Sequence, residues 1–314
     1  MATPTDSASP HSSALHFRRL RRRVVALGVL VILAFAGSSV YDILLSYRHA
    51  LLTTDREISN VATALAGQTS WTWQTVDLLL HETARWYRDD VPEIPAERID
   101  DVLANRVSGV RQVRLVTIVD AEGFQRHRSR GSSPPNLDVS DRTYFTSQRD
   151  GTANGMFTSE LLITRSENRP GVILSRRLDG NDGTFAGVVT AIVDLEDLKS
   201  FYQSVSLGRG DAIQLLRDDG SLLIRNPPTA NMVGQKFPTL ASAPRGPATR
   251  IVSPLDGTPD FIAVARVRDT PLVIAVTRDA ALALDAWRGE AIRLGARALV
   301  IALLGAITLI ALLR

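Results

Sequence analysis

Two apolar runs without charged residues lie near the ends of the chain, at residues 24–40 and 298–313. Each is about 16 or 17 residues long and lacks a polar stripe, which is close to what a helix needs to cross the hydrocarbon core of a bilayer. We therefore predict transmembrane helices at residues 24–42 and 294–313. For the second run the alternative is a buried core helix.

The charge beside the first run predicts the orientation of the chain. The run follows a cluster of arginines: Arg18, Arg19, Arg21, Arg22 and Arg23. Such a cluster is normally retained in the cytoplasm, so the segment between the two runs should be periplasmic, with the spans in the inner membrane. A cleaved signal peptide is the alternative, since residues 34–36 resemble a cleavage site. We predict that residues 1–23 form a disordered cytoplasmic N-terminus.

Between the two runs the apolar period is first helical and then extended. Residues 41–87 carry apolar side chains at helical spacing, which predicts one long helix leaving the membrane. The prolines of residues 91–95 end it, and a short helix at 96–106 follows. From residue 110 onward, short runs rich in valine, isoleucine and leucine are separated by turn signals, which predicts β-strands.

The strand pattern occurs twice. Residues 114–119 turn at Gly123 into a second strand, and residues 171–177 and 185–193 form a hairpin. A short helix at 141–149, capped by Ser140 or Asp141, lies between these pairs. A similar order recurs around Gly220 and around residues 256–258, before a last strand at 272–276. We predict two tandem modules, the alternative being chance recurrence of Asp-Gly turns.

Composition and motifs argue against catalysis. The chain has 45% hydrophobic and 22% charged residues, a net charge of +3 and no cysteine, so we expect a folded protein without disulfides and without nucleic acid as a partner. Its five histidines lack metal-ligand spacing, and no phosphate-binding loop or nucleophile elbow is present. The sequence therefore predicts no catalytic residues, no metal and no cofactor.

Four motifs between the spans, at residues 141–145, 175–178, 187–195 and 219–227, resemble the double Cache (PAS-like) sensor domain of bacterial membrane receptors. The closest type is the one fused to diguanylate cyclases and histidine kinases, and the likeness covers about residues 41–285. It implies an α+β fold with a long stalk helix and two PAS-like modules of antiparallel sheet. The membrane-distal module spans residues 43–205 and the membrane-proximal module 206–285. It also implies a homodimer.

The resemblance places a small-molecule site in the distal module. It assigns Arg142, Tyr144 and Phe145 to the pocket wall, with Asp194 and Arg176. An arginine, aromatics and an aspartate suit an amino acid, a carboxylate or a similar ligand. The amino-acid-binding members of this family carry a tryptophan near the position of Tyr144. This chain lacks it, so the ligand class stays open. The alternatives are an ion pair of Arg142 with Asp141 or Asp138, core packing for the two aromatics, and a surface charge for Arg176.

Two functions follow. The first is a receptor that senses a small extracytoplasmic ligand and signals across the lipid bilayer to a cytoplasmic output domain absent from this chain. A full-length parent could carry that cyclase or kinase domain after Arg314, or the output could be a separate partner. The second is a membrane-anchored extracytoplasmic binding or scaffold protein that signals through a partner. In neither does the chain itself act as an enzyme.

Overall fold

The structure is a computed structural model that describes residues 10–91, 94–131, 137–205, 208–229, 232–244, 249–254 and 257–313. It divides into two compact units. One comprises Met1–Thr54 with Ala281–Arg314, and the other is Asp55–Ala280. Helix α1 (Pro10–Asp89) contributes to both.

The first unit consists of two apolar helices. These are the first part of α1 and α7 (Asp285–Leu313), which follows the short α6 (Ala280–Ala283). Both are long and apolar enough to cross a membrane, and leucines such as Leu30 and Leu304 are more than half exposed. The Tyr47 and Trp287 rings lie 4.8 Å apart. Helix α1 begins at Pro10, within the segment that we expected to be disordered, and residues 1–9 lie outside the described part.

In the second unit α1 is a continuous stalk, as the helical spacing predicts. It ends at Asp89, ahead of the proline-rich segment. One stretch buries Ile58 and Leu65, and a later stretch buries Trp73 and Leu80, so the same helix supplies core side chains along its length. The Trp73 Nε1 also donates a hydrogen bond to Thr158 Oγ1 at 3.3 Å.

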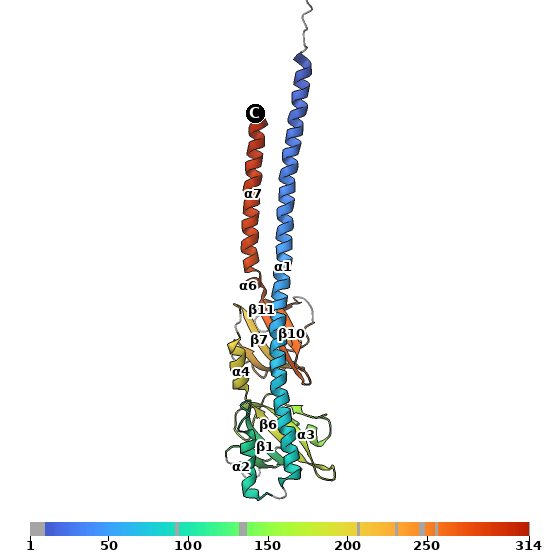
Figure 1. Cartoon of the computed structure of the whole chain (residues 1–314), viewed down its shortest axis with the longest axis vertical. Coiled ribbons are helices and arrows are strands. Elements are labelled where there is room, and N and C mark those ends of the chain that lie inside the picture. Colours follow the sequence, from blue (N-terminus) through green and yellow to red (C-terminus); the bar gives the residue numbers. More distant parts are fainter. Residues whose placement is uncertain are drawn as a thin grey trace, which may run out of the picture. The chain divides into compact units, whose positions relative to one another are not determined.

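The distal module is an antiparallel sheet with strand order β2-β1-β6-β5-β3, and β4 also pairs with β5 (Figure 1). Its elements are α2 (Ala96–Val107), β1 (Val113–Asp120), β2 (Gln125–Arg128), α3 (Thr143–Arg149), β3 (Phe157–Thr158), β4 (Leu162–Ile163), β5 (Pro170–Asp179) and β6 (Phe185–Val193). Side chains alternate between the two faces of each strand, so one face meets α3 and the other is available to α1.

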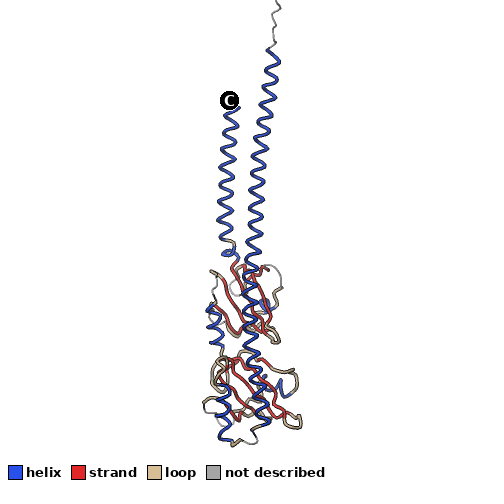
Figure 2. The backbone as a smooth tube through the Cα atoms, in the orientation of Figure 1, coloured by secondary structure: helices blue, strands red, loops and turns tan. Residues whose placement is uncertain are grey.

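The proximal module is a second antiparallel sheet, with strand order β8-β7-β11-β10-β9. Figure 2 shows the strands of the two modules, in red, as two separate groups. Helix α4 (Leu195–Ser204) precedes it. Its elements are β7 (Asp211–Arg217), β8 (Leu222–Asn226), α5 (Pro238–Ala241), β9 (Thr249–Val252), β10 (Pro259–Arg266) and β11 (Leu272–Asp279). Two PAS-like sheets in tandem confirm the predicted α+β architecture.

Two glycines show how closely the modules repeat each other. Gly123 and Gly220 have φ angles of 94° and 85°, a region that L side chains rarely adopt. The Gly123 carbonyl accepts a hydrogen bond from Val139 N at 2.8 Å, and the Gly220 carbonyl accepts one from Phe237 N at 2.7 Å. In each module the first turn therefore holds the segment that leads into the insert helix, so this turn is a structural repeat.

Candidate functional site

A small cavity lies in the distal module between α3 and the sheet. Its volume is ≈ 20 Å³, enough for a water molecule. Strand side chains form the floor, Tyr144 of α3 forms one wall, and the segment after β4 closes it. The residues around it are Thr117, Val119, Gln125, Leu137, Val139, Tyr144, Thr164, Arg165, Ser166, Ile173, Thr190 and Ile192.

Helix α3 is fixed to strand β5 by polar contacts at its back. Gln148 Nε2 donates to the carbonyls of Gly155 and Ser175, both at 2.9 Å. Ser175 Oγ in turn donates to the Tyr144 carbonyl at 2.7 Å. The predicted cap is wrong: the helix begins at Thr143 with Arg142 at its N-cap and no side-chain cap, because Asp141 is engaged elsewhere.

Arg165, which lines the cavity, forms an ion pair with Asp141, and we call this pair the latch. Arg165 donates from Nη1 and Nη2 to the two Asp141 carboxylate oxygens, at 2.6 and 2.8 Å, and from Nη1 to the Asp138 carbonyl at 2.8 Å. This bidentate bond lowers the pKa of Asp141. The side chains are 37% and 61% exposed, so the pair lies at the surface and opening it costs little.

Among the described residues, the lining of the cavity mixes polar with apolar side chains and contains no carboxylate. Thr117 and Thr190 share a hydrogen bond of 2.6 Å between their hydroxyls, across strands β1 and β6. Burial raises the pKa of Tyr144 to about 12, so its phenol stays neutral at physiological pH and can donate or accept. Hydroxyls beside one guanidinium suit a small ligand with a carboxylate and a polar group.

Of the residues predicted for the pocket, Tyr144 alone lines this cavity. Phe145 is fully buried beside it and packs edge-on against Phe185, with ring centroids 5.6 Å apart. It supports the wall from behind. Arg142 is half-buried at the start of α3, and the partner predicted for it, Asp141, is taken by Arg165.

The other two predicted residues lie elsewhere. Asp194 caps α4, accepting a hydrogen bond from Glu196 N at 3.0 Å, and it lines a different cavity, of ≈ 300 Å³, with Gln112 and Phe201. Arg176 lies on the α1 side of the sheet, where its Nε is 2.8 Å from Asp77 Oδ1. Sequence reasoning missed Arg165, whose position in the loop after β4 carries no motif.

The chain is similar to a known domain family and to solved structures. The sequence matches the family model of the Cache domain over residues 47–287. The extracellular domain of rpHK1S-Z16, a protein described as a histidine kinase, is 30% identical, with a TM-score of 0.66. That match covers 72% of this chain and 95% of the other. No curated protein shows significant similarity to the sequence.

Ligand-binding domains of chemoreceptors share the fold at lower identity. The domain of CtaA from Pseudomonas fluorescens, in complex with L-serine, is 15% identical with a TM-score of 0.58, covering 72% of this chain and 97% of that one. The domain of PctB from Pseudomonas aeruginosa PAO1, in complex with L-Arg, is 14% identical with a TM-score of 0.58, covering 74% and 96%. At such identities the likeness shows the fold alone.

Proposed function

The chain belongs to the Cache domain family, and on that premise we propose that it is the sensing part of a transmembrane receptor whose ligand is an amino acid, a carboxylate or a similar small molecule. The ligand binds in the distal cavity, and the signal passes to an output domain or partner in the cytoplasm. The observation that carries this proposal is the polar cavity beneath the Arg165–Asp141 latch. Binding, and not catalysis, is the task of this domain.

Ligand entry requires the latch to open. A cavity of ≈ 20 Å³ is far below the few hundred Å³ of ordinary ligand pockets. When Asp141 releases Arg165, the guanidinium can form the same bidentate bond with a ligand carboxylate. The ligand then stabilises an open arrangement of the segment after β4, and this differential affinity is what a receptor needs to shift between two states.

The sheet connects the cavity to the stalk. Ser175 holds α3, and its neighbour Arg176 points to the other face of β5, where it pairs with Asp77 of α1 at 2.8 Å. Thr158 of β3, which also pairs with β5, accepts the hydrogen bond from Trp73. A shift of α3 on β5 would therefore reach α1 through two polar contacts.

The stalk also supports a homodimer. Trp71 and Leu78 are 56% and 63% exposed, and they lie seven residues apart on one side of α1. Large apolar side chains at heptad spacing are typical of helix pairing. Trp71→Ala should weaken the dimer of the full chain in sedimentation, whereas Gln74→Ala, on an exposed neighbouring position, should change it less.

Thermal shift of the full chain in lipid nanodiscs, screened against amino acids, carboxylates, amines and purines, tests the ligand proposal. A ligand that binds the native state raises the melting temperature. We expect a hit from the amino acids or carboxylates that Arg165→Ala weakens by at least about tenfold in Kd, since a charge-assisted bidentate contact is lost.

Arg149→Ala is the matched control, because Arg149, the last residue of α3, makes a surface ion pair with Asp150 at 2.8 Å and does not line the cavity. A hit that Arg165→Ala and Tyr144→Ala leave unchanged would place the ligand elsewhere. If no compound raises the melting temperature, the scaffold function replaces the receptor.

A further inference from the structure

A further cavity, larger than the one beneath α3, lies between the two sheets of the Asp55–Ala280 unit, with a volume of ≈ 270 Å³. It is formed by β1 and the start of β5 from the distal module, by α4, and by β8 from the proximal module. Its lining residues are Arg114, Leu161, Arg169, Pro170, Leu195, Glu196, Lys199, Leu223, Ile224, Arg225, Pro228 and Val233. None of them lines the cavity beneath α3.

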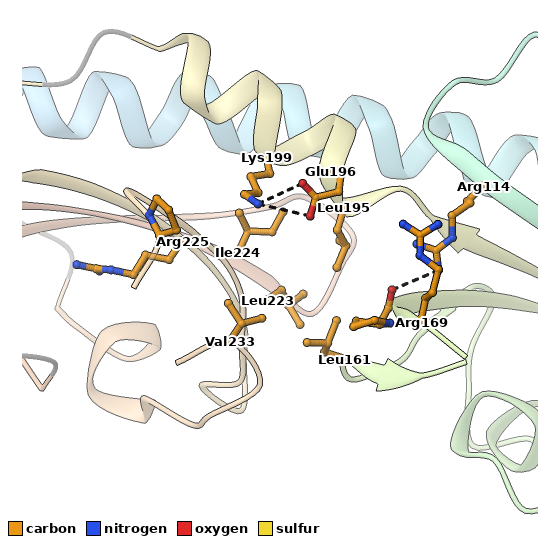
Figure 3. Close-up of a pocket in the computed structure, with 12 residues that line it drawn as sticks. Arg114, Leu161, Arg169, Leu195, Glu196, Lys199, Leu223, Ile224, Arg225 and Val233 are labelled. Carbon is orange, nitrogen blue, oxygen red and sulfur yellow. Dashed lines mark hydrogen bonds and ion pairs between the residues drawn. The ribbon is translucent and has the colours of Figure 1, made fainter. Parts of the chain in front are cut away.

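The cations of this cavity lie at its two ends. Figure 3 shows Arg114 and Arg169 on one side and Lys199 and Arg225 on the other, with apolar side chains between them. Leu223 and Ile224 form part of that middle section and are nearly fully buried. An arrangement of cationic ends around an apolar middle favours an anion at each end of an aliphatic chain.

Nearby carboxylates pair with two of these four cations, Arg114 and Lys199. Glu196 is the one acidic residue in the lining, and its bond to Lys199 is 3.2 Å long between side chains that are 72% and 34% exposed. An exposed pair of this kind is worth little and is easily exchanged for a ligand. Glu167 holds Arg114 Nε at 2.6 Å, and Arg114 Nη2 donates to the Pro170 carbonyl, so this guanidinium is fixed in place.

The other two cations differ in how freely they can reach a ligand. Arg169 is exposed, and none of the hydrogen bonds or ion pairs recorded between described residues involves its side chain. Arg225 is oriented by its Nε bond to Thr229 Oγ1 at 3.0 Å. Arginine presents several donors in a planar fork, so Arg169 can bind a carboxylate through two hydrogen bonds, and Arg225 can offer the donors that Thr229 and Gln214 leave.

Helix α4 gives the cavity a rigid side. The Tyr202 hydroxyl shares a hydrogen bond of 2.8 Å with Thr69 of α1, and Asn226 Nδ2 of β8 donates to the Tyr202 carbonyl at 3.0 Å. Tyr202 is fully buried. Because α4 is held to the stalk and to the proximal sheet together, Lys199 has a defined position relative to Arg225.

We propose that this cavity is a second ligand site, which binds an aliphatic dicarboxylate with one carboxylate at the Arg114–Arg169 end and the other at the Lys199–Arg225 end. A ligand held at both ends would tie the distal module to the proximal one. It would thereby favour one arrangement of the two sheets, independently of a ligand beneath α3.

Isothermal titration of the full chain in nanodiscs with glutarate, adipate and suberate tests this site. At least one of them should bind, and hexanoate, with the length of adipate but one carboxylate, should bind at least about tenfold more weakly. Raising the salt concentration should weaken dicarboxylate binding, because partly exposed charge pairs are screened.

The variant Arg169→Met/Arg225→Met keeps the apolar stems and removes one cation from each end, so we expect dicarboxylate binding to fall at least about tenfold. Arg85→Met, at a surface position on α1 that is 57% exposed, should bind like the wild type. Arg165→Ala should also bind dicarboxylates normally, which separates this site from the one beneath α3.

Three results would overturn the proposal. They are the absence of binding by every dicarboxylate of the series, equal affinity for hexanoate and adipate, or wild-type affinity in the double variant. Because Arg169 is exposed, Arg169→Glu serves as a second variant that does not endanger folding, and it should also weaken binding.

Discussion

The distal and proximal modules have the same plan but different interiors on the corresponding face. In the distal module α3 has seven residues and lies over a cavity that several hydroxyls and Arg165 line. In the proximal module α5 has four residues, and the corresponding face is filled by Leu216, Leu222, Phe237, Leu240, Ala243, Ile262 and Ala275. The distal face is also packed, around Leu115, Phe145 and Ile192, but it retains this cavity. Under the proposed function the distal module binds the ligand and the proximal module transmits the shift, since a packed core shifts as a body.

The polar groups that the proximal face retains are already paired. The Gln214 amide and the Thr277 hydroxyl are 3.2 Å apart, at positions that resemble those of Thr117 and Thr190 in the distal sheet. In the distal module the threonine pair borders a cavity, whereas Gln214 is fully buried. The same repeated sheet therefore presents its polar groups to a cavity in one module and to other protein groups in the other.

The largest effect is expected from the aromatic residues at the two insert helices. Phe145→Ala should destabilise the chain by about 3–5 kcal/mol and abolish the ligand-dependent thermal shift, because a fully buried ring supports the Tyr144 wall. Phe237→Ala should cost a similar or slightly smaller amount, since Phe237 is 8% exposed, but should leave ligand affinity within about twofold. Chemical denaturation and thermal shift measure the two quantities. Equal loss of binding in both variants would contradict the division of tasks.

Substitution of Gly123 or Gly220, the glycines of the repeated turn, should cost nearly as much stability as substitution of the aromatic residues. A Cβ at Gly123 would lie 2.7 Å from Ser140 Cα, and one at Gly220 would lie 2.6 Å from Pro238 N. Both contacts involve backbone atoms, so each Gly→Ala change should cost about 2–3 kcal/mol in denaturation experiments.

Gly151→Ala is the matched control for these two. Gly151 also has a positive φ, of 69°, but a Cβ there meets nothing within 4 Å among the described residues, so the cost should be about 1 kcal/mol. A similar cost at all three positions would mean that conformation alone, and not contact with the segment before the insert helix, makes the two turns essential.

A smaller effect, a gain in ligand affinity, is expected when the Arg165–Asp141 latch is broken. Asp141→Asn removes the negative charge that holds Arg165, so the guanidinium becomes available and ligand affinity should rise by about two- to fivefold. The affinity is measured by titration with the hit from the screen. Unchanged or reduced affinity would show that Asp141 does not compete with the ligand. Asp150→Asn, which breaks the surface pair with Arg149, is the control.

The smallest effect concerns acid stability in the proximal module. Burial alone would raise the pKa of Asp219, but hydrogen bonds from Lys236 and Ser221 outweigh it and lower this pKa to about 2. A carboxyl with a lower pKa in the folded state stabilises the fold above its unfolded pKa, near 3.9, and this contribution disappears as the pH falls toward 2.

At pH 6 the Asp219→Asn variant should therefore have a slightly lower melting temperature than the wild type. The loss in free energy of unfolding should be less than about 1 kcal/mol, because the Asp219 side chain is partly exposed. The melting temperatures of the variant and the wild type should converge as the pH falls from 4 to 2. A difference that stays constant over this range would mean that the amide substitution acts through packing and not through charge.

The sequence by itself determined most of the elements and their order, although it predicted neither α4 and α5 nor the two-residue strands β3 and β4. Helical spacing over residues 41–87, apolar runs at both ends, and strand pairs around Gly123 and Gly220 are local signals, and each led to an element that the structure contains. The fold was predictable because period and turn chemistry depend on near neighbours. Tyr144 was predicted for the pocket wall from the motif that resembles the family, and the structure places it in the lining of the candidate cavity.

The tertiary structure alone decided which charges meet. Arg165 joins Asp141 across 24 residues, Arg176 joins Asp77 across 99, and Asp194 caps α4 and does not line the distal cavity. A charged side chain on a strand or loop can pair on either face, and alternation along the strand does not say which face meets the stalk. The cavity between the modules is equally invisible in the chain, because its cations come from β1, β5, α4 and β8 and are brought together by the packing of two sheets.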